Sequence, residues 1–558
     1  MLLRTSLVTI ALFFSLAACS SAVGDAAVDS TESALAHSSD LASVMPPHLA
    51  VMFSMSWFGI PASGDPLGAG PDTSWGNWQI PGQCSPKGTP GACVNGERDI
   101  ASRYRPLAGI YSSSGRDQEG LARIDLMLSN VRRPCAGDVG ARIDAFAVQL
   151  NGTRFSSLHD ASPAGSVELP LQALKHFYSE ANAAGLTDAV LPGDDATWYF
   201  NNGHWVGLDC KADRAACLGA LQQDAVDMLT LAVDNASSLR IAGKPVLYFY
   251  FSNQLSPSEW SGILNTARST KINGVTHDFY ALASRQGSGG APYFAAFDGI
   301  SPWIDLAAWN GSSGTSVRAH AAKYAADLHA ELYAGVPPGR VVLGGIGPGF
   351  DDFTNGWSQC VTRQIPSTSE SAPRDPAVLD GMIDFLKTKG TKGLILETWD
   401  DWTEGSFFEP SVSEGTSKLE QLQSRLGDLY GEAVISSLPL RDRWVNYGQP
   451  HGCGGEKPAP VTPLCGGTGP APCSAPAILE PTASENVGAA IHLRVSAPGC
   501  TVAMIPYIDS KQVHATIQGA AIDAWVPVTP GPHALVVNGW DANGQVHVSS
   551  TITFDRTY

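Results

Sequence analysis

The sequence predicts an α/β fold, a (β/α)8 TIM-like barrel, followed by a small all-β sandwich, and three observations support this fold class. Short apolar runs alternate with amphipathic helical stretches through residues 46–447. Several of these runs are apolar at every position, as expected of parallel strands that are buried on both faces. After a stretch rich in Pro and Gly, residues 476–558 alternate apolar and polar side chains without a helical pattern.

Eight strand candidates follow one another in the first region. They are Ala50–Trp57, Asp144–Gln149, Asp188–Leu191, Pro245–Phe251, Asp278–Ala283, Ile300–Ile304, Arg340–Gly344 and Gly393–Thr398. The helix candidates between them include Asp117–Arg132, Pro170–Ala184, Leu218–Ser237, Val317–Tyr333 and Pro376–Lys389. Eight strands with intervening helices fit a barrel with insertions. A doubly wound open sheet is the alternative, but no G-x-G-x-x-G motif opens a helix after the first strand, which disfavours it.

The end of the chain predicts a linker and a second domain. Residues 448–475 are rich in Pro and Gly and nearly free of apolar periodicity, which indicates a linker. Strand-like alternation follows at Ile491–Val495, Ala534–Val537 and His547–Ile552. Asp541–Gly544 is a hairpin turn signal. We expect residues 476–558 to form a β-sandwich, and its final hairpin resembles bacterial immunoglobulin-like modules.

Composition excludes two classes of protein. The chain has 558 residues and carries 53 acidic against 35 basic side chains, a formal charge of −18. A nucleic-acid binder needs basic patches that displace counterions from phosphates, so we expect no nucleic-acid partner. A disordered chain is excluded by the 44% of hydrophobic residues and by the 14 Trp distributed along the sequence.

The first residues predict export. Arg4 precedes the apolar stretch Leu7–Leu16, which is too short to span a bilayer. Leu16-Ala17-Ala18-Cys19 resembles the lipobox of bacterial lipoproteins, which implies a signal peptide over 1–18 and a lipid on Cys19. An ordinary secretory signal is the alternative. Residues 19–45 are expected to be a flexible tether, and Ser20 favours an anchor in the outer membrane or at the cell surface. No later segment is apolar for long enough to cross a membrane, so the lipid is the expected membrane contact.

The cysteines agree with an oxidising compartment. Besides Cys19 there are ten, an even number that suits structural disulfides. Cys84/Cys93 and Cys210/Cys217 are close enough in sequence to close single loops, whereas the overall connectivity stays open. Three more cysteines crowd the linker, at Cys453, Cys465 and Cys473. No C-x-x-C pair and no His pair at ligand spacing occurs, so we expect neither a metal nor another cofactor.

The eighth strand candidate runs directly into an acidic, aromatic segment. Glu397-Thr398-Trp399-Asp400-Asp401-Trp402-Thr403-Glu404 holds four carboxylates and two tryptophans. Active sites of barrels lie where strands end. Glycoside hydrolysis needs one carboxylic acid and one carboxylate, and an apolar wall raises the pKa of the acid. On the residues alone, a solvated acidic loop or helix start is an equal alternative.

Five segments resemble glycoside hydrolase families 71 and 99. Trp399–Gly405 is similar to their eighth-strand motif, W-N-D/E-[WY]-x-E. Four further segments agree in order along the chain: Trp57–Gly59 with Trp75–Trp78, Arg105–Ser113 with Ile143–Val148, Phe297–Trp303, and Gly347–Asp352. The resemblance covers residues 50–415 and leaves out the sandwich.

The resemblance implies that Glu404 is the general acid/base. It implies for Asp401 the second role, either as base for water or as an assistant to the 2-hydroxyl of the sugar. An Asp at this place resembles family 71, the α-1,3-glucanases, whereas family 99 mannanases have Glu. Asp400 stands where these families show Asn. The stereochemical outcome depends on the separation of the carboxylates and is left open.

Other side chains near the predicted strand ends are expected to contact the sugar. They are Trp57, Trp78, Tyr111, Asp194, Asp195, Trp198, Tyr250, Trp303, Asp351, Trp399, Asp400 and Trp402. Helix capping is an equal alternative for Asp194, Asp195 and Trp198. Core packing is the favoured reading of Tyr250, which alternates with Phe249. Glu397 is expected to be a buried, paired carboxylate.

The sequence therefore predicts an endo-acting glycoside hydrolase that cleaves an α-linked polysaccharide, such as α-1,3-glucan or α-mannan, without a cofactor. The alternative is a non-catalytic glycan-binding lipoprotein in which the sandwich binds. Because binding alone requires no acid and base, the Asp401/Glu404 pair favours the enzyme. No G-x-S-x-G motif supports another hydrolase class, and the oligomeric state stays open.

Overall fold

The computed structural model describes most of the barrel and the sandwich. The described residues are 40–58, 93–94, 97–98, 100–107, 109–113, 118–131, 140–150, 169–196, 198–201, 204–207, 210, 213–251, 254–352, 363–367, 369–432, 475–482, 486–487, 490–497, 501–509, 511–513, 517–518, 521–541 and 546–556. Several predictions lie outside them: the signal peptide, Cys19, most of the tether, Trp78, Cys84, the cysteines at 453, 465 and 473, and nearly all of the linker.

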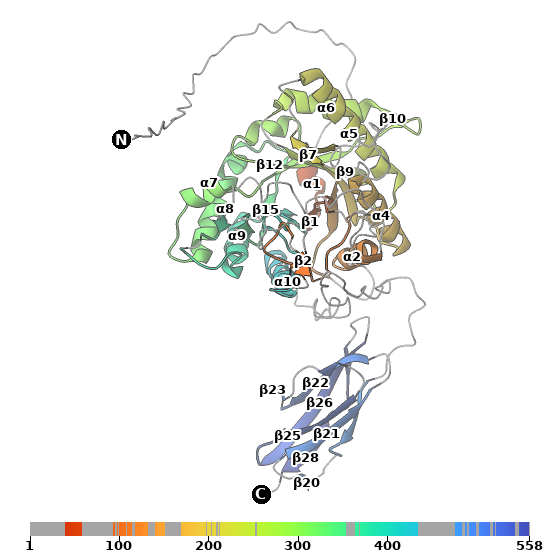
Figure 1. Ribbon diagram of the computed structural model, residues 1–558, viewed down its shortest axis with the longest axis vertical. Coiled ribbons are helices and arrows are strands. Elements are labelled where there is room, and N and C mark those ends of the chain that lie inside the picture. Colours follow the sequence, from red (N-terminus) through yellow and green to blue (C-terminus); the bar gives the residue numbers. More distant parts are fainter. Residues whose placement is uncertain are drawn as a thin grey trace, which may run out of the picture. The chain divides into compact units, whose positions relative to one another are not determined.

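Parallel strands close into a barrel (Figure 1). In ring order they are β1 (Leu49–Ser54), β4 (Ala145–Gln149), β5 (Val190–Asp195), β9 (Lys244–Phe251), β12 (Tyr280–Arg285), β13 (Gly299–Pro302), the pair β14 (Val341–Val342) and β15 (Gly344–Ile346), and β18 (Gly393–Leu396). β14 pairs with β13 and β15 pairs with β18, so together they fill the seventh position. β18 then pairs with β1. The predicted (β/α)8 barrel and its eight strands are confirmed, and the closed ring excludes the open sheet.

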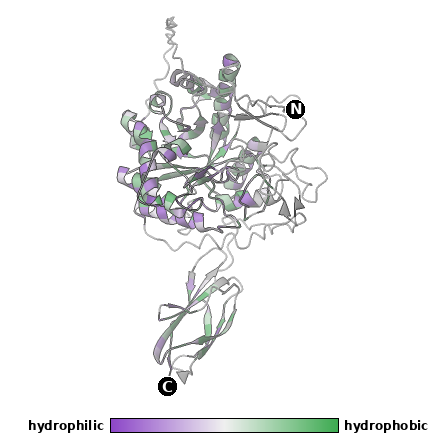
Figure 2. Ribbon diagram, turned by 60° about the vertical axis from the view of Figure 1, so that its left-hand side comes forward, coloured by the Kyte–Doolittle hydropathy of each residue, from purple (hydrophilic) through white to green (hydrophobic). Residues whose placement is uncertain are grey.

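Helices surround the ring, and Figure 2 shows hydrophilic residues spread over them. The longer ones are α2 (Gln118–Leu128), α4 (Leu169–Ala183), α5 (Arg214–Asp234), α6 (Pro257–Ser269), α8 (Val317–Gly335), α9 (Pro376–Lys389) and α10 (Ser417–Tyr430). The shorter ones are α1 (Leu41–Val44), α7 (Leu306–Gly311) and the 3-10 helix η1 (Ala291–Ala295). All five helix candidates are confirmed, with α9 at its predicted bounds. Within the described residues, no helix is both long and apolar enough to cross a bilayer.

Alternation along the strands separates two apolar layers. On β9, Leu247 and Phe249 face the layer between strands and helices, whereas Tyr248 and Tyr250 face the barrel interior. Leu41 and Met45 are also buried in the interior cluster. The predicted tether extended to residue 45, so the folded chain begins earlier than expected.

Several short strands lie outside the ring of barrel strands. They are β2 (Cys93–Val94), β3 (Glu97–Arg98), β6 (Trp198–Asn201), β7 (His204–Gly207), β8 (Arg240–Ile241), β10 (Lys271–Ile272), β11 (Val275–Thr276), β16 (Phe350–Asp351) and β17 (Gln364–Ile365). β16 and β17 form an antiparallel pair that follows the seventh strand of the ring. This pair places Asp351 and Asp352 beside the segment that follows β18, because the amide of Asp351 donates to the carbonyl of Glu404 at 2.7 Å.

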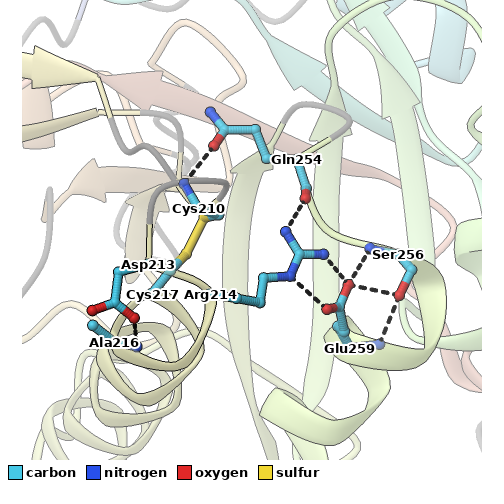
Figure 3. Close-up of a disulfide and its surroundings, with 8 residues drawn as sticks. All are labelled: Cys210, Asp213, Arg214, Ala216, Cys217, Gln254, Ser256 and Glu259. Carbon is cyan, nitrogen blue, oxygen red and sulfur yellow. Dashed lines mark hydrogen bonds and ion pairs between the residues drawn. A yellow bond between two sulfur atoms is a disulfide. The ribbon is translucent and has the colours of Figure 1, made fainter.

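The Cys210–Cys217 disulfide is present, as predicted, with an S–S distance of 2.00 Å (Figure 3). Next to it, the Asp213 carboxylate caps α5 by accepting from the amide of Ala216 at 2.9 Å. Arg214 donates to the Gln254 carbonyl at 2.6 Å and to Glu259 at 2.7 Å. The start of α5 is thereby tied to the start of α6.

The C-terminal residues form two facing sheets whose strands are antiparallel except for the parallel pair of the short β20 with β28. One contains β19 (Ala477–Glu480), β21 (Ala490–Ser496) and β25 (Ala521–Pro527). The other contains β20 (Asn486–Val487), β28 (Ile552–Arg556), β26 (Gly531–Asp541), β22 (Thr501–Ile508), β23 (Lys511–Gln512), β24 (Ile517–Gln518) and β27 (Val546–Val548). Apolar residues from both sheets share one core, among them Leu493, Val526 and Val537. The predicted all-β sandwich is confirmed, although the predicted strand His547–Ile552 is divided between β27 and β28, since Ser549 turns its hydroxyl to the amide of Val537.

Candidate active site

The segment that follows β18 folds back on itself at the carboxyl ends of the barrel strands. The amide of Thr398 donates to the carbonyl of Ser406 at 2.6 Å, and the amide of Glu409 donates to that of Trp399 at 2.8 Å. The amide of Trp399 donates to the carbonyl of Phe53, beside the end of β1, at 2.7 Å. The acidic segment is therefore fixed to the barrel by its main chain as well as by its side chains.

Asp401 sits inside this turn. Its Oδ1 accepts from the Thr403 hydroxyl at 2.9 Å and from the amide of Glu404 at 3.0 Å. The Thr398 hydroxyl accepts from the amide of Asp401 at 2.8 Å. Burial raises the pKa of Asp401 to about 6, while the hydrogen bonds that its carboxylate accepts from Thr403 and Glu404 stabilise the charged form and oppose the rise. Asp401 is therefore a carboxylate at neutral pH and is held in one orientation.

Glu404 is less buried than Asp401 but lies among more acidic groups. Burial raises its pKa well above the usual range, and Asp401, Asp352 and Asp195 raise it further, while Arg363 opposes them. When two carboxyl groups share a site, ionisation of one disfavours ionisation of the other. Ionisation of Asp401 therefore favours the protonated form of Glu404.

Groups from other strand ends complete this acidic cluster. Asp195 ends β5 and accepts from the Gln149 side chain at 3.2 Å. Tyr250, near the end of β9, has its pKa raised by burial first and then by Asp195 and Glu404. The ring of Trp303, just after β13, lies 4.5 Å from that of Tyr250. Of the sequence-predicted residues, the structure thus brings together Asp195, Tyr250, Trp303, Asp401 and Glu404.

Asp352 joins the cluster from the segment after β16. It is fully buried and forms an ion pair with Arg363, next to β17. Among the described residues, no group of three or more His, Cys, Asp or Glu is arranged to hold a metal ion. Within the described part of the chain, the cluster combines these carboxyl groups with the guanidinium of Arg363.

Asp400 points away from Asp401 into a buried network. Its Oδ1 accepts from the amide of Met55 at 2.7 Å, and its Oδ2 pairs with Arg123. The Arg123 Nε donates to Glu409 at 3.1 Å. Burial raises the pKa of Asp400 to about 7, against the effect of Arg123. Asp400 was predicted to contact the sugar, and in this structure its carboxylate has no exposed surface.

Tyr111 and Trp402 belong to the same network. The Tyr111 hydroxyl donates to Glu409 at 2.7 Å, and the Trp402 indole donates to Glu409 at 3.1 Å. Trp402 also stacks on Phe407 with ring centroids 3.8 Å apart. Trp399 packs edge-on against Phe146 at 5.4 Å. Tyr111, Trp399 and Trp402 are fully buried, so in this structure none of them offers a face to a sugar.

Four other predicted residues lie around the cluster. Asp351 is buried and accepts from Arg103 at 3.3 Å and from the Tyr104 hydroxyl at 3.1 Å. Asp194 is buried in β5, and Trp57 is partly buried and packs edge-on against Phe58 at 6.4 Å. Trp198 begins β6, and its side chain lies outside the description.

Glu397 is buried, as predicted, but its partner is not a cation. Its Oε2 accepts from the amide of Ile304 at 2.9 Å, and its Oε1 has no hydrogen-bond partner among the described residues. Burial raises its pKa well above the usual range, against the effect of the Ile304 amide, so burial favours the neutral form of this side chain. Glu397 links the end of β18 to the residue after Trp303.

Arg123, Glu409 and Arg363 lie at the site and were not predicted from the sequence. Arg123 shares the buried face of α2 with Gly120, Ile124 and Met127, at the i, i+3, i+4, i+7 spacing of an apolar stripe. A charged residue at such a position requires a buried partner. This position of Arg123 within an apolar stripe was the one sequence signal for a buried ion pair. It does not indicate which carboxylate is the partner.

The chain is similar to several solved structures. No protein-family model matches the chain, and no curated protein matches it. An endo-α-mannosidase of glycoside hydrolase family 99 from Bacteroides thetaiotaomicron is similar over 69% of this chain and 98% of that chain, with 17% identity and a TM-score of 0.45. The same kind of enzyme from this organism, bound to BIS-TRIS-propane, gives the same coverage, 15% identity and a TM-score of 0.43. A glycoside hydrolase-like protein covers 69% of this chain and 95% of its own, with 13% identity and a TM-score of 0.43.

Proposed function

We propose that this protein is a glycoside hydrolase in which Glu404 is the general acid and Asp401 the general base. The observation that carries the proposal is the unequal proton affinity of two carboxyl groups in one turn. Burial raises the pKa of both groups, to about 6 for Asp401, and the neighbouring Asp401 raises that of Glu404 further. An acid and a base with separated pKa values are what glycoside hydrolysis requires at neutral pH.

The roles follow from which group holds the proton. Glu404 donates its proton to the glycosidic oxygen as the bond from that oxygen to the anomeric carbon breaks. Asp401 takes the proton of the attacking nucleophile, either water or the 2-hydroxyl of the sugar itself. Asp195 and Asp352 place further negative charge near the positive charge that develops on the sugar ring, which favours an oxocarbenium-like transition state.

The proposed substrate is an α-linked polysaccharide of the α-1,3-glucan or α-mannan type, cleaved within the chain. This choice depends on the resemblance of residues 399–405 to the eighth-strand motif of glycoside hydrolase families 71 and 99. An Asp at position 401 favours the glucan within that choice.

The test is cleavage of a polysaccharide panel. Purified protein is incubated with α-glucans and α-mannans, and new reducing ends are followed. Glu404→Gln and Asp401→Asn should each lower the rate by about 10²–10⁴-fold, the usual contribution of a general acid or base. Asp327→Asn, which removes a surface carboxylate paired with Lys323 on α8, is the matched control and should cleave at the wild-type rate.

Two results would contradict the proposal. If Glu404→Gln and Asp401→Asn cleave as fast as wild type, the catalytic pair is wrong. If no polysaccharide is cleaved while several bind, the protein is a glycan-binding lipoprotein, the alternative that the sequence also predicts.

A further inference from the structure

The three-stranded sheet of the sandwich carries an exposed aromatic side chain on its outer face. Trp525 in β25 is 69% exposed, and among the described residues no other Trp, Tyr or Phe side chain is exposed. By contrast, Trp260, Trp309, Trp399 and Trp402 in the barrel are almost completely buried. The inward neighbours of Trp525, Ala524 and Val526, already supply the sandwich core, so core packing does not explain a large aromatic at this position.

The Trp525 indole is held in one orientation. His492 lies directly opposite it on β21, and the two rings stack with centroids 4.7 Å apart and planes 11° apart. The imidazole Nδ1 lies 2.9 Å from Glu480 in β19. The Oε1 of Glu480 accepts from Arg494 at 3.0 Å. We name Trp525, His492, Glu480 and Arg494 the outer-face row, because they form one line of contacts across all three strands.

This arrangement leaves one flat face of the indole available. A parallel stack covers a single face of a ring, so the exposed surface of Trp525 belongs to the opposite face and the edges. β25 pairs with β21, and no other described strand pairs with β25. The open face therefore points past the edge of this sheet. A fixed orientation also reduces the conformational entropy that a ligand would otherwise have to overcome.

The chemistry of the row selects among possible ligands. One indole face among charged side chains offers too little apolar area for a stable protein interface, which buries more than about 1,000 Å². A single basic side chain, Arg494, does not provide the cluster of Lys and Arg that binds an anionic membrane. A pyranose ring fits, because its C–H face stacks on an aromatic ring while its hydroxyls pair with guanidinium and carboxylate groups.

We propose that the outer-face row is a polysaccharide-binding site, with Trp525 as its stacking residue and Arg494 and Glu480 as hydroxyl-binding groups. The site holds the sandwich on the polymer that the barrel cleaves. The choice of polymer rests on the proposed function, whereas the binding of a sugar chain at this face does not.

The test separates binding from cleavage. Full-length Trp525→Ala and wild type, each also carrying Glu404→Gln so that the polymer stays intact, are mixed with insoluble α-1,3-glucan, α-mannan or cellulose, and the bound fraction is measured. We expect Trp525→Ala to bind the preferred α-polysaccharide at least ~10-fold more weakly, as expected for loss of a central aromatic contact. Trp525→Tyr should retain part of the binding. Val548→Ala, which shortens a side chain that is 53% exposed on the other sheet, should bind as wild type.

A second readout identifies the site as distinct from the catalytic one. With Glu404 intact, Trp525→Ala should cleave a short soluble oligosaccharide at the wild-type rate and the insoluble polymer more slowly. Because the Trp525 side chain is exposed, the Trp525→Ala variant should have the same melting temperature as wild type. Equal binding of wild type and Trp525→Ala to every polysaccharide overturns the proposal. The proposal is also overturned if Trp525→Ala loses self-association but keeps polysaccharide binding. In that case the outer-face row would bind a second copy of the chain. Failure of the barrel to cleave any substrate would leave the binding result unaffected.

Discussion

Asp400 and Asp401 are neighbours in sequence with opposite environments. Asp400 turns into the protein and pairs with Arg123, whereas Asp401 turns toward Glu404 and accepts hydrogen bonds from its own turn. The sequence shows two consecutive acids and gives no basis for distinguishing them, because the difference arises from a guanidinium on α2. The resemblance to known families singled out Asp401, and the packing of Asp400 gives a physical reason for treating the two differently.

At the scale of single residues, Arg123 is expected to be essential for stability. It is the cation between two fully buried carboxyl groups, Asp400 and Glu409. Arg123→Met would leave both groups without a counter-ion, which typically costs about 3–5 kcal/mol. Denaturant unfolding would measure this loss. Arg318→Met, which removes a half-exposed partner of Asp384, is the control and should cost about 1 kcal/mol or less. A variant at Arg123 as stable as the control would show that the network contributes little.

The pKa values of the proposed catalytic pair, Asp401 and Glu404, predict a bell-shaped pH dependence of activity. Activity requires Asp401 charged and Glu404 protonated, so it should rise as pH increases through about 6, the pKa of Asp401. It should fall at higher pH as Glu404, whose pKa is raised by burial and then by Asp401, loses its proton. The profile of kcat/KM against pH reports both limbs. An acid limb centred near pH 4 would show that Asp401 is not the base.

At the scale of elements, the turn after β18 depends on Gly405. This residue has a φ of +62°, and a Cβ there would lie 2.9 Å from the carbonyl oxygen of Asp351 in β16. Gly405→Ala should therefore displace Glu404 and lower activity by at least ~10-fold, since small misplacements at a reacting centre are costly. Gly415 has a similar φ of +58° with no atom within 4 Å of such a Cβ. Gly415→Ala should cost about 1 kcal/mol of stability and leave kcat unchanged. Equal activity losses in the two variants would attribute the effect to backbone strain instead of displacement.

Strands were predictable because their apolar runs are local. Every strand of the ring was located, with shifts of a few residues at the ends. The interruption of the seventh strand at Leu343 was not predictable. It arises because β14 pairs with β13 whereas β15 pairs with β18, and strand pairing across the barrel leaves no local pattern in the sequence. α6 was absent from the predicted helices, although Ser256 and Glu259 form a capping box and Trp260, Ile263, Leu264 and Ala267 form its buried stripe.

The site was predictable in part, because some of its features are also local in the sequence. Carboxylates at strand ends can be counted in a sequence, and the acidic cluster contains several that were named in advance. The direction of each side chain within the turn is set by packing across the barrel. Trp399 and Trp402 were therefore assigned to the sugar, whereas the structure buries both in apolar clusters.

The lipid expected on Cys19 gives a prediction about localisation. Cys19→Ala should move the protein from the membrane fraction to the soluble exported fraction, because a lipid is the membrane contact that the sequence predicts. Cell fractionation with an antibody to the protein would measure it. Ser20→Ala, at the adjacent position, is the control and should stay in the membrane fraction. A Cys19→Ala variant that remains in that fraction would indicate another anchor.

The pairing of β1 with β18 has a consequence for how the protein is made. Leu49 in the first strand of the ring is opposite Gly393 in the last, and the acidic turn follows immediately. Such distant contacts form late, because the intervening chain must first be ordered. A ribosome has therefore released nearly the whole barrel before the residues that close it, and those that give it an acid and a base, become available. Barrel closure and the proposed catalytic pair therefore depend on the same late segment of the chain, so a chain truncated before β18 should be neither closed nor active.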